Sequence, residues 1–387
     1  MNARGQIWPE KKGVQPWMVG VICILVLAAA ILIAAARFDV IYIPGISPST
    51  PAPPSSSKIS MLVIYPANCS ECVSLKVLET DINTALSGRL ETGYLRDFMP
   101  DAKTLIQQYN IKRLPTAILD GNFPQDFLDS WAQVGTVELD GNLVFRQVWP
   151  PYLDVDSNTA KGLVTAITLE DENCSQCGDA QLVISQLQQA GVYISSDRQQ
   201  TYSRNSDFGV QAVALYDLKR FPVILFSRDL NDYFIDPSWW EQVGGKTASN
   251  GIFLYDAIVP YYDSAQQKIV GVVKVTYLKD DKCPNCYNVH DYHRPMLQAY
   301  GMVLDADEKY VDANSVQGKK LIQDYNIRAI PTILLSADAN AYQLPFSRFV
   351  SDFLQLGTIE KDGVFVLRDL NALQDANGNA LVYSQLN

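Results

Sequence analysis

The sequence predicts an α/β protein of three tandem units behind one N-terminal transmembrane helix. Two observations in this chain of 387 residues carry the prediction. Six of its seven cysteines form three CxxC pairs whose first cysteines stand at positions 69, 174 and 283, a near-constant period of domain size. Residues 18–36 are apolar and uncharged. Repetition at a fixed period indicates repeated structural units, and about 20 apolar residues are long enough to cross a bilayer.

The charges around residues 18–36 predict the orientation of this helix. Three basic residues precede it, whereas Arg37 is followed by no Lys or Arg before Lys58. Positive charge collects on the cytoplasmic side of a spanning helix. We therefore expect residues 1–17 in the cytoplasm, a single pass through the cell membrane, and an extracytoplasmic remainder. A cleaved signal peptide is the alternative, because alanines end the apolar run.

Residues 37–58 are rich in proline and serine, which predicts an extended linker. Ordered structure should begin at its end. We place the three units at 59–154, 155–263 and 264–387. The first two end on a Pro-Tyr-x-Asp segment that the third lacks, so we interpret this segment as a connector between units.

The same order of patterns surrounds each CxxC pair. Apolar, β-branched runs at 61–65, 163–167 and 272–277 precede the pairs and are typical of buried strands. A helical pattern, a second strand and a second helix follow, and then a proline between apolar residues. A hairpin with an Asp-Gly or Asn-Gly turn closes each repeat. The three prolines, 46 to 48 residues after the first cysteine, are Pro115, Pro222 and Pro331.

The approach to the proline is itself repeated. LIQQYNIKRLPT at 105–116 and LIQDYNIRAIPT at 321–332 share eight of twelve residues. A CxxC pair in a strand–helix pattern is typical of redox proteins, and with these motifs residues 59–387 resemble the thioredoxin superfamily three times over. The resemblance implies a central mixed sheet flanked by helices. It also implies cis peptide bonds before the three prolines, which would lie beside the CxxC pairs and bind the substrate backbone.

The six paired cysteines are the candidate catalytic residues. A thiolate at a helix N-terminus is stabilised by the helix dipole, which lowers the cysteine pKa from about 8.5. In a CxxC turn the first cysteine attacks and the second resolves the mixed disulfide. We assign exposed nucleophiles at Cys69, Cys174 and Cys283, and resolving cysteines at Cys72, Cys177 and Cys286.

Two departures from the superfamily pattern concern charge. Thioredoxin-like enzymes often bury an acid six residues before the first cysteine, where this chain has Val63, Thr168 and Tyr277, so a proton acceptor is missing there. Acidic residues precede both Cys174 (Asp171 and Glu172) and Cys283 (Asp280 and Asp281), but Lys282 adjoins Cys283 whereas no basic residue lies near Cys174 in sequence. Because nearby carboxylates oppose a thiolate and a nearby cation favours it, we expect reduced Cys283 to alkylate faster than Cys174. The direction of the redox reaction is left open.

Two other functions remain alternatives. The pairs can be structural or regulatory disulfides on a non-enzymatic binding scaffold. They can also bind metal, most simply with Cys283, Cys286, His290 and His293, the last two being the only histidines. A straight helix holds these side chains too far apart for one tetrahedral ion. We therefore predict no metal site, expect both histidines on a solvated helix face, and place Trp239-Trp240 in a core or interface.

Composition limits the partners. The net charge is -11, and nucleic-acid binding requires basic patches, so no nucleic acid is expected. The sequence predicts a thiol–disulfide oxidoreductase or isomerase that requires no cofactor. Its partners would be the thiols and disulfides of exported polypeptides, an unknown redox partner, and the membrane.

Overall fold

The structure, a computed structural model, describes residues 58–387 except 234, 236, 344–346, 376 and 387. The predicted transmembrane helix at 18–36 and nearly all of the predicted linker at 37–58 lie outside the described residues. Within the described part of the chain, no helix combines the length and apolar character needed to cross a membrane.

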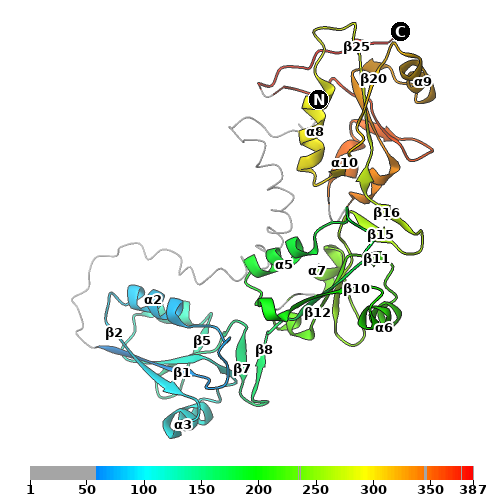
Figure 1. Ribbon diagram of the computed structural model, residues 1–387. Coiled ribbons are helices and arrows are strands. Elements are labelled where there is room, and N and C mark those ends of the chain that lie inside the picture. The colour runs from blue at the N-terminus through cyan, green and yellow to red at the C-terminus, as the bar shows by residue number, and fades with distance from the viewer. Residues whose placement is uncertain (1–57, 234, 236, 344–346, 376, 387) are drawn as a thin grey trace.

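Three five-stranded mixed sheets with the same connectivity follow one another along the chain, each with its own helices (Figure 1). In each sheet the strand before the CxxC pair is parallel to the next strand and antiparallel to the strand that follows the proline. The first sheet has the order β2–β1–β4–β6–β5 and consists of β1 (Ile59–Tyr65), β2 (Leu90–Arg96), β4 (Thr116–Asp120), β5 (Gly135–Val137) and β6 (Leu143–Phe145).

The second and third sheets repeat this order. The second, β10–β9–β12–β14–β13, consists of β9 (Ala166–Glu170), β10 (Gln199–Ser203), β12 (Val223–Phe226), β13 (Gly245–Thr247) and β14 (Phe253–Tyr255). The third, β20–β18–β22–β24–β23, consists of β18 (Val275–Lys279), β20 (Lys309–Asp312), β22 (Thr332–Leu335), β23 (Gly357–Ile359) and β24 (Phe365–Leu367). The mixed sheets implied by the resemblance are therefore present three times.

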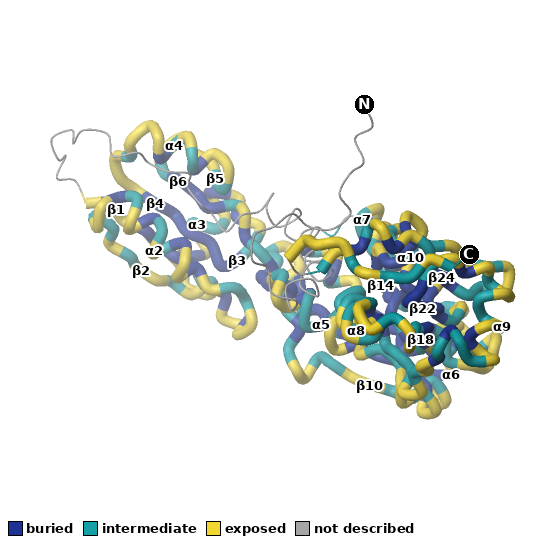
Figure 2. The backbone as a smooth tube through the Cα atoms, turned by 90° about the horizontal axis from the view of Figure 1, so that it is seen from above, coloured by how far each residue is buried: buried dark blue, intermediate teal, exposed yellow. Residues whose placement is uncertain are grey.

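Helices cover both faces of each sheet. Because side chains alternate along a strand, Met61 and Val63 of β1 pack on one face and Ile64 packs on the other. Buried residues accordingly gather on the central strands (Figure 2). Two helices cover one face of each sheet. They are α2 (Lys76–Ala85) and α4 (Gln125–Trp131) in the first, α5 (Ala180–Gln189) and α7 (Pro237–Gln242) in the second, and α8 (Val289–Ala299) and α10 (Phe349–Phe353) in the third. One helix covers the other face: α3 (Pro100–Gln108) in the first sheet, α6 (Asp207–Tyr216) in the second and α9 (Val316–Asp324) in the third.

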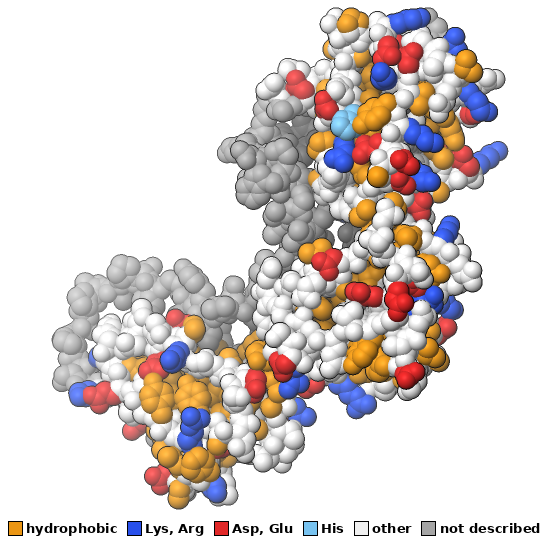
Figure 3. Space-filling model, in the orientation of Figure 1, with side chains coloured by type: hydrophobic (Ala, Val, Ile, Leu, Met, Phe, Trp, Pro, Cys, Tyr) orange, Lys and Arg blue, Asp and Glu red, His pale blue; other side chains and the backbone are white. Residues whose placement is uncertain are grey.

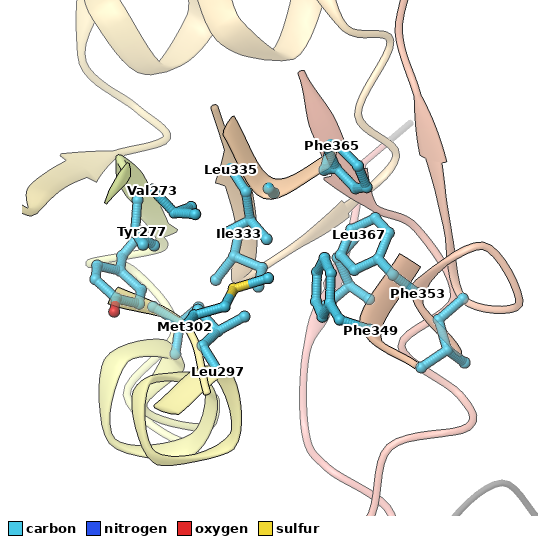
Figure 4. Packing of buried hydrophobic residues seen from close by; sticks show 14 of the residues in the cluster. Val273, Tyr277, Leu297, Met302, Ile333, Leu335, Phe349, Phe353, Phe365 and Leu367 are labelled. Carbon is cyan, nitrogen blue, oxygen red and sulfur yellow. The ribbon is translucent and has the colours of Figure 1, made fainter. Parts of the chain in front are cut away.

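Large side chains fill the α8 and α10 face of the third sheet. Figure 4 shows Ile333 and Leu335 of β22 between Met302 on one side and Phe349 and Phe365 on the other. In the second sheet Trp240 is 2% exposed and packs in the equivalent core, so the prediction for the Trp239-Trp240 pair is confirmed.

Short strands outside the main sheets correct the interpretation of the connectors. β3 pairs with β7 and β7 with β8, and β11, β15 and β16 repeat this arrangement. In the third repeat β25 pairs with β21 in the same way, so this repeat does contain the equivalent segment. These strands are β3 (Arg113–Leu114), β7 (Tyr152–Asp154), β8 (Thr159–Lys161), β11 (Arg220–Phe221), β15 (Tyr261–Asp263), β16 (Lys268–Val270), β21 (Ala329–Ile330) and β25 (Ser384–Gln385).

The remaining elements are short. The hairpin β7–β8 crosses the boundary expected after residue 154, and β15–β16 crosses the one expected after residue 263. Two further strands, β17 (Val272–Val273) and β19 (Val303–Leu304), form a parallel pair. The 3-10 helices are η1 (Ser196–Arg198), η2 (Arg228–Tyr233) and η3 (Ala337–Ala341).

Candidate functional site

Each CxxC pair forms a disulfide in the loop that follows the inner strand of the parallel pair in its sheet. The bonds join Cys69 to Cys72, Cys174 to Cys177, and Cys283 to Cys286, with Cα atoms 5.4 Å apart in every pair. The loops follow β1, β9 and β18, so the sheet places all three disulfides at equivalent positions. The structure therefore brings together the cysteines that the sequence paired.

The position of the loops relative to the helices differs from the expectation. α5 begins at Ala180 and α8 at Val289, beyond the disulfide loops, and α2 begins later still, at Lys76. The first amides of α5 and α8 are capped by the side chains of Asp179 and Asn288. The cysteines therefore lie before the first helical turn, where the dipole effect is strongest, and not within it, and at α5 and α8 capping side chains already accept from the first amides.

The exposure of the first cysteines also departs from the expectation. Cys69 is 8% exposed, whereas Cys174 and Cys283 are partly exposed. A buried sulfur is less accessible to an attacking thiolate. The expectation of an exposed nucleophile is therefore wrong for the first site.

The three prolines lie with the disulfides, and the peptide bonds before Pro115, Pro222 and Pro331 are cis, as predicted. In the second site the Sγ atom of Cys177 lies 3.3 Å from the carbonyl oxygen of Phe221, which precedes the proline. In the third, the hydroxyl of Tyr287, next to Cys286, donates to the carbonyl of Pro331 at 2.9 Å. In the first, Cys72 and Leu114 pack in one apolar cluster.

A segment of the same chain closes the backbone edge beside each disulfide. The residue after the second cysteine donates its amide to a carbonyl of this segment. These bonds are Val73 to Pro151 at 2.8 Å, Gly178 to Pro260 at 2.7 Å, and Tyr287 to Val382 at 3.0 Å. The strands that precede the prolines pair with β7, β15 and β25. The edge that the resemblance assigns to a substrate chain is therefore already occupied.

Arg204 places a cation beside Asp171, which lies three residues before Cys174. Its guanidinium pairs with Asp171, whose side chain is fully buried, and lies over the rings of Phe221 and Tyr262. Arg204 lies 30 residues beyond Cys174 in sequence and was not considered in the charge ranking. Because this cation offsets the Asp171 carboxylate, one of the acidic residues counted against Cys174 is neutralised, and the faster alkylation of Cys283 stays a prediction.

His293 is completely buried, contrary to the expected solvated helix face. Its Nε2 atom lies 3.0 Å from the hydroxyl oxygen of Tyr287. Since that hydroxyl donates to Pro331, Nε2 carries the proton, and Nδ1 is left without a partner. Burial lowers the pKa of His293 to about 3. His290, by contrast, is only partly buried and contacts Asp291 at 2.8 Å.

The positions six residues before the first cysteines hold no carboxylate. Tyr277 is fully buried, stacks on Tyr310 and meets the edge of His290. Burial first, and Glu308 second, raise the pKa of Tyr277, so its hydroxyl keeps its proton. Burial is the largest single influence on Glu308 and opposes its ionisation, but the hydrogen bonds from Arg294 and Tyr277 and the charge of Arg294 together outweigh burial, so the pKa of Glu308 is lowered. This cluster therefore offers no buried carboxylic acid next to the sulfurs.

The third site contains a polar contact that the sequence analysis missed. The hydroxyl oxygen of Ser384 lies 3.6 Å from Cys286 Sγ and donates to Asp280 Oδ2 at 3.1 Å. Ser384 and Cys286 are 98 residues apart in sequence, so no local pattern relates them. The position of Asp280, three residues before Cys283, was the one available signal.

Charge on the surface forms no single-sign field in the view of Figure 3, where acidic and basic side chains alternate. Among the described residues, no group of three or more His, Cys, Asp or Glu side chains is arranged to hold a metal ion. His293 points to Tyr287 and not to the cysteines as a ligand would.

Comparison with known proteins gives distant matches only. No protein-family model and no curated protein matches the chain. A crystal structure of ERdj5, form I, aligns over 76% of this chain and 39% of its own, at 12% identity and a TM-score of 0.14. A crystal structure of human ERp44, form II, aligns over 81% of this chain and 93% of its own, at 9% identity and a TM-score of 0.14. The zinc-bound form of human ERp44 aligns over 78% and 87% at 10% identity, with a TM-score of 0.14.

The chain thus spans about two fifths of the length of the ERdj5 chain it matches. Matches of this identity and TM-score carry no argument about activity. The fold and the site by themselves define a mixed α/β protein with three CxxC disulfides beside cis-prolines.

Proposed function

We propose that the chain is a membrane-anchored, extracytoplasmic thiol–disulfide oxidoreductase or isomerase acting on exported polypeptides. One observation carries the chemical part of this proposal. In each of three sheets a CxxC disulfide follows the inner strand of the parallel pair and lies beside a cis-proline peptide. A short CxxC loop contributes little as a staple, because the stabilisation by a disulfide grows with loop length. Three such pairs at equivalent positions are therefore better suited to exchange than to holding the fold.

The exchange balances in atoms and electrons. A client thiolate attacks the first cysteine sulfur, the CxxC bond breaks, and its electron pair stays on the second cysteine as a thiolate. A second client thiolate then attacks the client sulfur of the mixed disulfide and releases the first cysteine. The client loses two protons and two electrons, which the CxxC pair and solvent receive. The reverse sequence, starting from the dithiol, reduces a client disulfide.

The prolines have a narrower role in this proposal than the superfamily resemblance implies. The strand edges before Pro115, Pro222 and Pro331 are paired with β7, β15 and β25. A client sulfur would therefore approach across the outer side of the CxxC loop. We propose that the prolines shape this approach and that the paired edge keeps binding of long client segments weak.

The first test measures exchange. We expect the purified chain to accelerate reduction of insulin by dithiothreitol, and the variant with serine at Cys69, Cys174 and Cys283 to lose the acceleration. Each site is then examined by restoring one cysteine at a time. A chain that folds, as judged by circular dichroism, yet gives no acceleration at any site would exclude the proposed activity.

A second candidate is a binding scaffold with structural disulfides. The buried Cys69 and the closed strand edges favour it. The same serine variants distinguish the two functions, because a scaffold has no exchange activity for the substitutions to remove and loses at most stability, whereas an oxidoreductase loses turnover.

The second test concerns topology. Because basic residues cluster before residue 18 and the linker at 37–58 is rich in proline and serine, we expect protease added outside intact cells to cut within the linker. The expected product is a released fragment that begins near Lys58. Protection of the linker in intact cells, with cutting only after lysis, would reverse the orientation, and a fragment released without protease would indicate a cleaved signal.

A further inference from the structure

We propose that Ser384 relays the proton of the Cys286 thiol to Asp280 when Cys286 resolves a mixed disulfide on Cys283. The inference rests on the proposed thiol–disulfide exchange. It assigns the third site a proton acceptor, Asp280, reached through a hydroxyl that β25 supplies from a distant part of the sequence, whereas the position six residues before Cys283 holds no carboxylate.

The geometry places one hydroxyl between the sulfur and the carboxylate. Ser384 Oγ is 3.6 Å from Cys286 Sγ and donates to Asp280 Oδ2 at 3.1 Å. The serine is held by backbone bonds on both sides of it. Its strand β25 pairs with β21, where Ser384 lies opposite Ile330, and the amide of Leu386 donates to Arg328 at 2.8 Å. A hydroxyl both accepts and donates, so it can pass a proton between its two neighbours.

The other two sites do not repeat this arrangement. Ser384 pairs across the strands with Ile330, the residue before Pro331. At the equivalent position Leu153 pairs with Leu114 in the first site, and Tyr262 pairs with Phe221 in the second. Leu153 has no hydroxyl, and the ring of Tyr262 packs on Arg204. The second site does have a carboxylate three residues before its first cysteine, but that group, Asp171, is paired with Arg204. Of the three disulfides described, only the third combines a hydroxyl at the sulfur with a carboxylate beyond it.

Hydrogen bonds hold the carboxylate of Asp280 in place. Its Oδ1 atom accepts from the amide of Lys282 at 3.0 Å and from Asn314 at 3.1 Å, and Asp280 takes part in no ion pair among the described residues. The titratable and charged groups on the surrounding elements are Lys279 paired with Asp281, Asp312, Lys282, Tyr287, His293 and Arg328. With a pKa of about 3, His293 stays neutral over the range in which a thiol titrates.

The step balances. In the mixed disulfide, Cys283 Sγ is bonded to the client sulfur and Cys286 is a thiol. The Cys286 proton moves to Ser384 Oγ as the serine proton moves to Asp280 Oδ2. The Cys286 thiolate attacks Cys283 Sγ, the bond to the client breaks, and the client leaves as a thiolate. Asp280 then returns its proton to solvent or to the departing thiolate.

The test follows one resolving step at one site in the full chain. Reduced protein is mixed with oxidised glutathione, quenched with acid and digested, and the Cys283–glutathione adduct is measured by mass. Its lifetime reports attack by Cys286. We expect Ser384→Ala to lengthen this lifetime at least about tenfold near pH 7, because a positioned base contributes about 10²-fold or more. The difference should vanish above about pH 9, where a thiol ionises without help.

Three further variants separate proton relay from a structural role. Ser384→Thr keeps the hydroxyl and should restore the wild-type lifetime. Asp280→Asn should slow the step as Ser384→Ala does, and the double variant no further, since both residues act on one proton. Gln385→Ala, on the exposed side of β25, is the matched control and should change nothing. The adducts on Cys69 and Cys174 in the same digest should keep their lifetimes.

Two outcomes of the lifetime measurement overturn the relay. One is an Ser384→Ala lifetime within twofold of wild type at pH 7, and the other is an equal slowing at pH 7 and above pH 9, which indicates displacement of β25. If Ser384→Ala fails to fold, the adduct lifetime of Asp280→Asn measured at pH 7 and above pH 9 is judged by the same two criteria. Failure of the proposed function gives a different result. In that case the chain would not accelerate insulin reduction, yet the lifetime of the Cys283–glutathione adduct would still depend on Ser384. No adduct on Cys283 at all would overturn the relay itself.

Discussion

Replacing Arg204 with alanine is expected to lower the free energy of unfolding of the second sheet by about 3 kcal/mol, the low end of the cost of removing one member of a buried ion pair. Asp171 is fully buried, and without Arg204 its charge would remain in the interior without a cation. We take the low end because the guanidinium is 24% exposed. Loss of its contacts with Phe221 and Tyr262 acts in the same direction.

Hydrogen exchange of the β9 and β12 amides under native conditions measures this loss, with the amides of the first and third sheets as internal references. The matched control is Lys219→Ala, which removes an exposed pair with Asp217 and should cost less than about 1 kcal/mol. In an Asp171→Asn background the Arg204→Ala change should cost much less. An equal cost in both backgrounds would show that packing on the rings, and not the ion pair, carries the effect.

The third sheet is expected to lose stability as the pH falls from about 6.5 toward 3, by about 1.4 kcal/mol per pH unit from His293 alone. The folded-state pKa of His293 is about 3 because the ring is buried, whereas an unfolded histidine titrates near about 6.5. Between these values the unfolded chain binds a proton that the folded chain does not. The contribution of His293 is therefore complete above about pH 6.5 and is lost as the pH falls.

Urea unfolding followed by pulse proteolysis, with fragments of the third repeat identified by mass, measures this slope. We compare wild type with His293→Phe, which fills the site without titrating. The stability of the variant relative to wild type should rise as the pH falls. The control is His290→Gln, a change on the same helix but at a partly exposed position. It should leave the pH dependence of the unfolding free energy as it is in wild type. Parallel pH profiles for wild type and His293→Phe would contradict the burial argument.

Much of the fold follows from local sequence patterns. Apolar, β-branched runs predicted the strands β1, β9 and β18, and the Asp-Gly and Asn-Gly turns predicted the three hairpins. The repeated approach to Pro115 and Pro331 led to the expectation of cis bonds, which the structure contains. The strands and hairpins are predictable because hydrophobic period and turn residues act over a few neighbouring positions, whereas the cis bonds were implied by the superfamily resemblance that the repeated motif carries.

The errors concern contacts between residues far apart in the chain. His293 was expected on a solvated face, but α8 packs so that this side of the helix lies against Tyr287 and the third core. The segments after the hairpins were interpreted as connectors, yet they pair with β3 and β11, and β25 does so with β21. Strand pairing over such separations depends on register and on the packing of whole elements, for which a single sequence gives no local signal.

By itself the sequence determined that three CxxC pairs follow three buried strands and that a proline follows each pair at a near-constant distance, and the superfamily resemblance implied the mixed sheets and the cis bonds. Only the tertiary structure decided the environment of each sulfur. It buried Cys69, paired Asp171 with Arg204 across 33 residues, and placed Ser384 beside Cys286 across 98. Covalent spacing fixes which cysteines can bond, whereas burial, charge pairing and proton transfer depend on side chains that meet only when the sheets and their edge strands assemble.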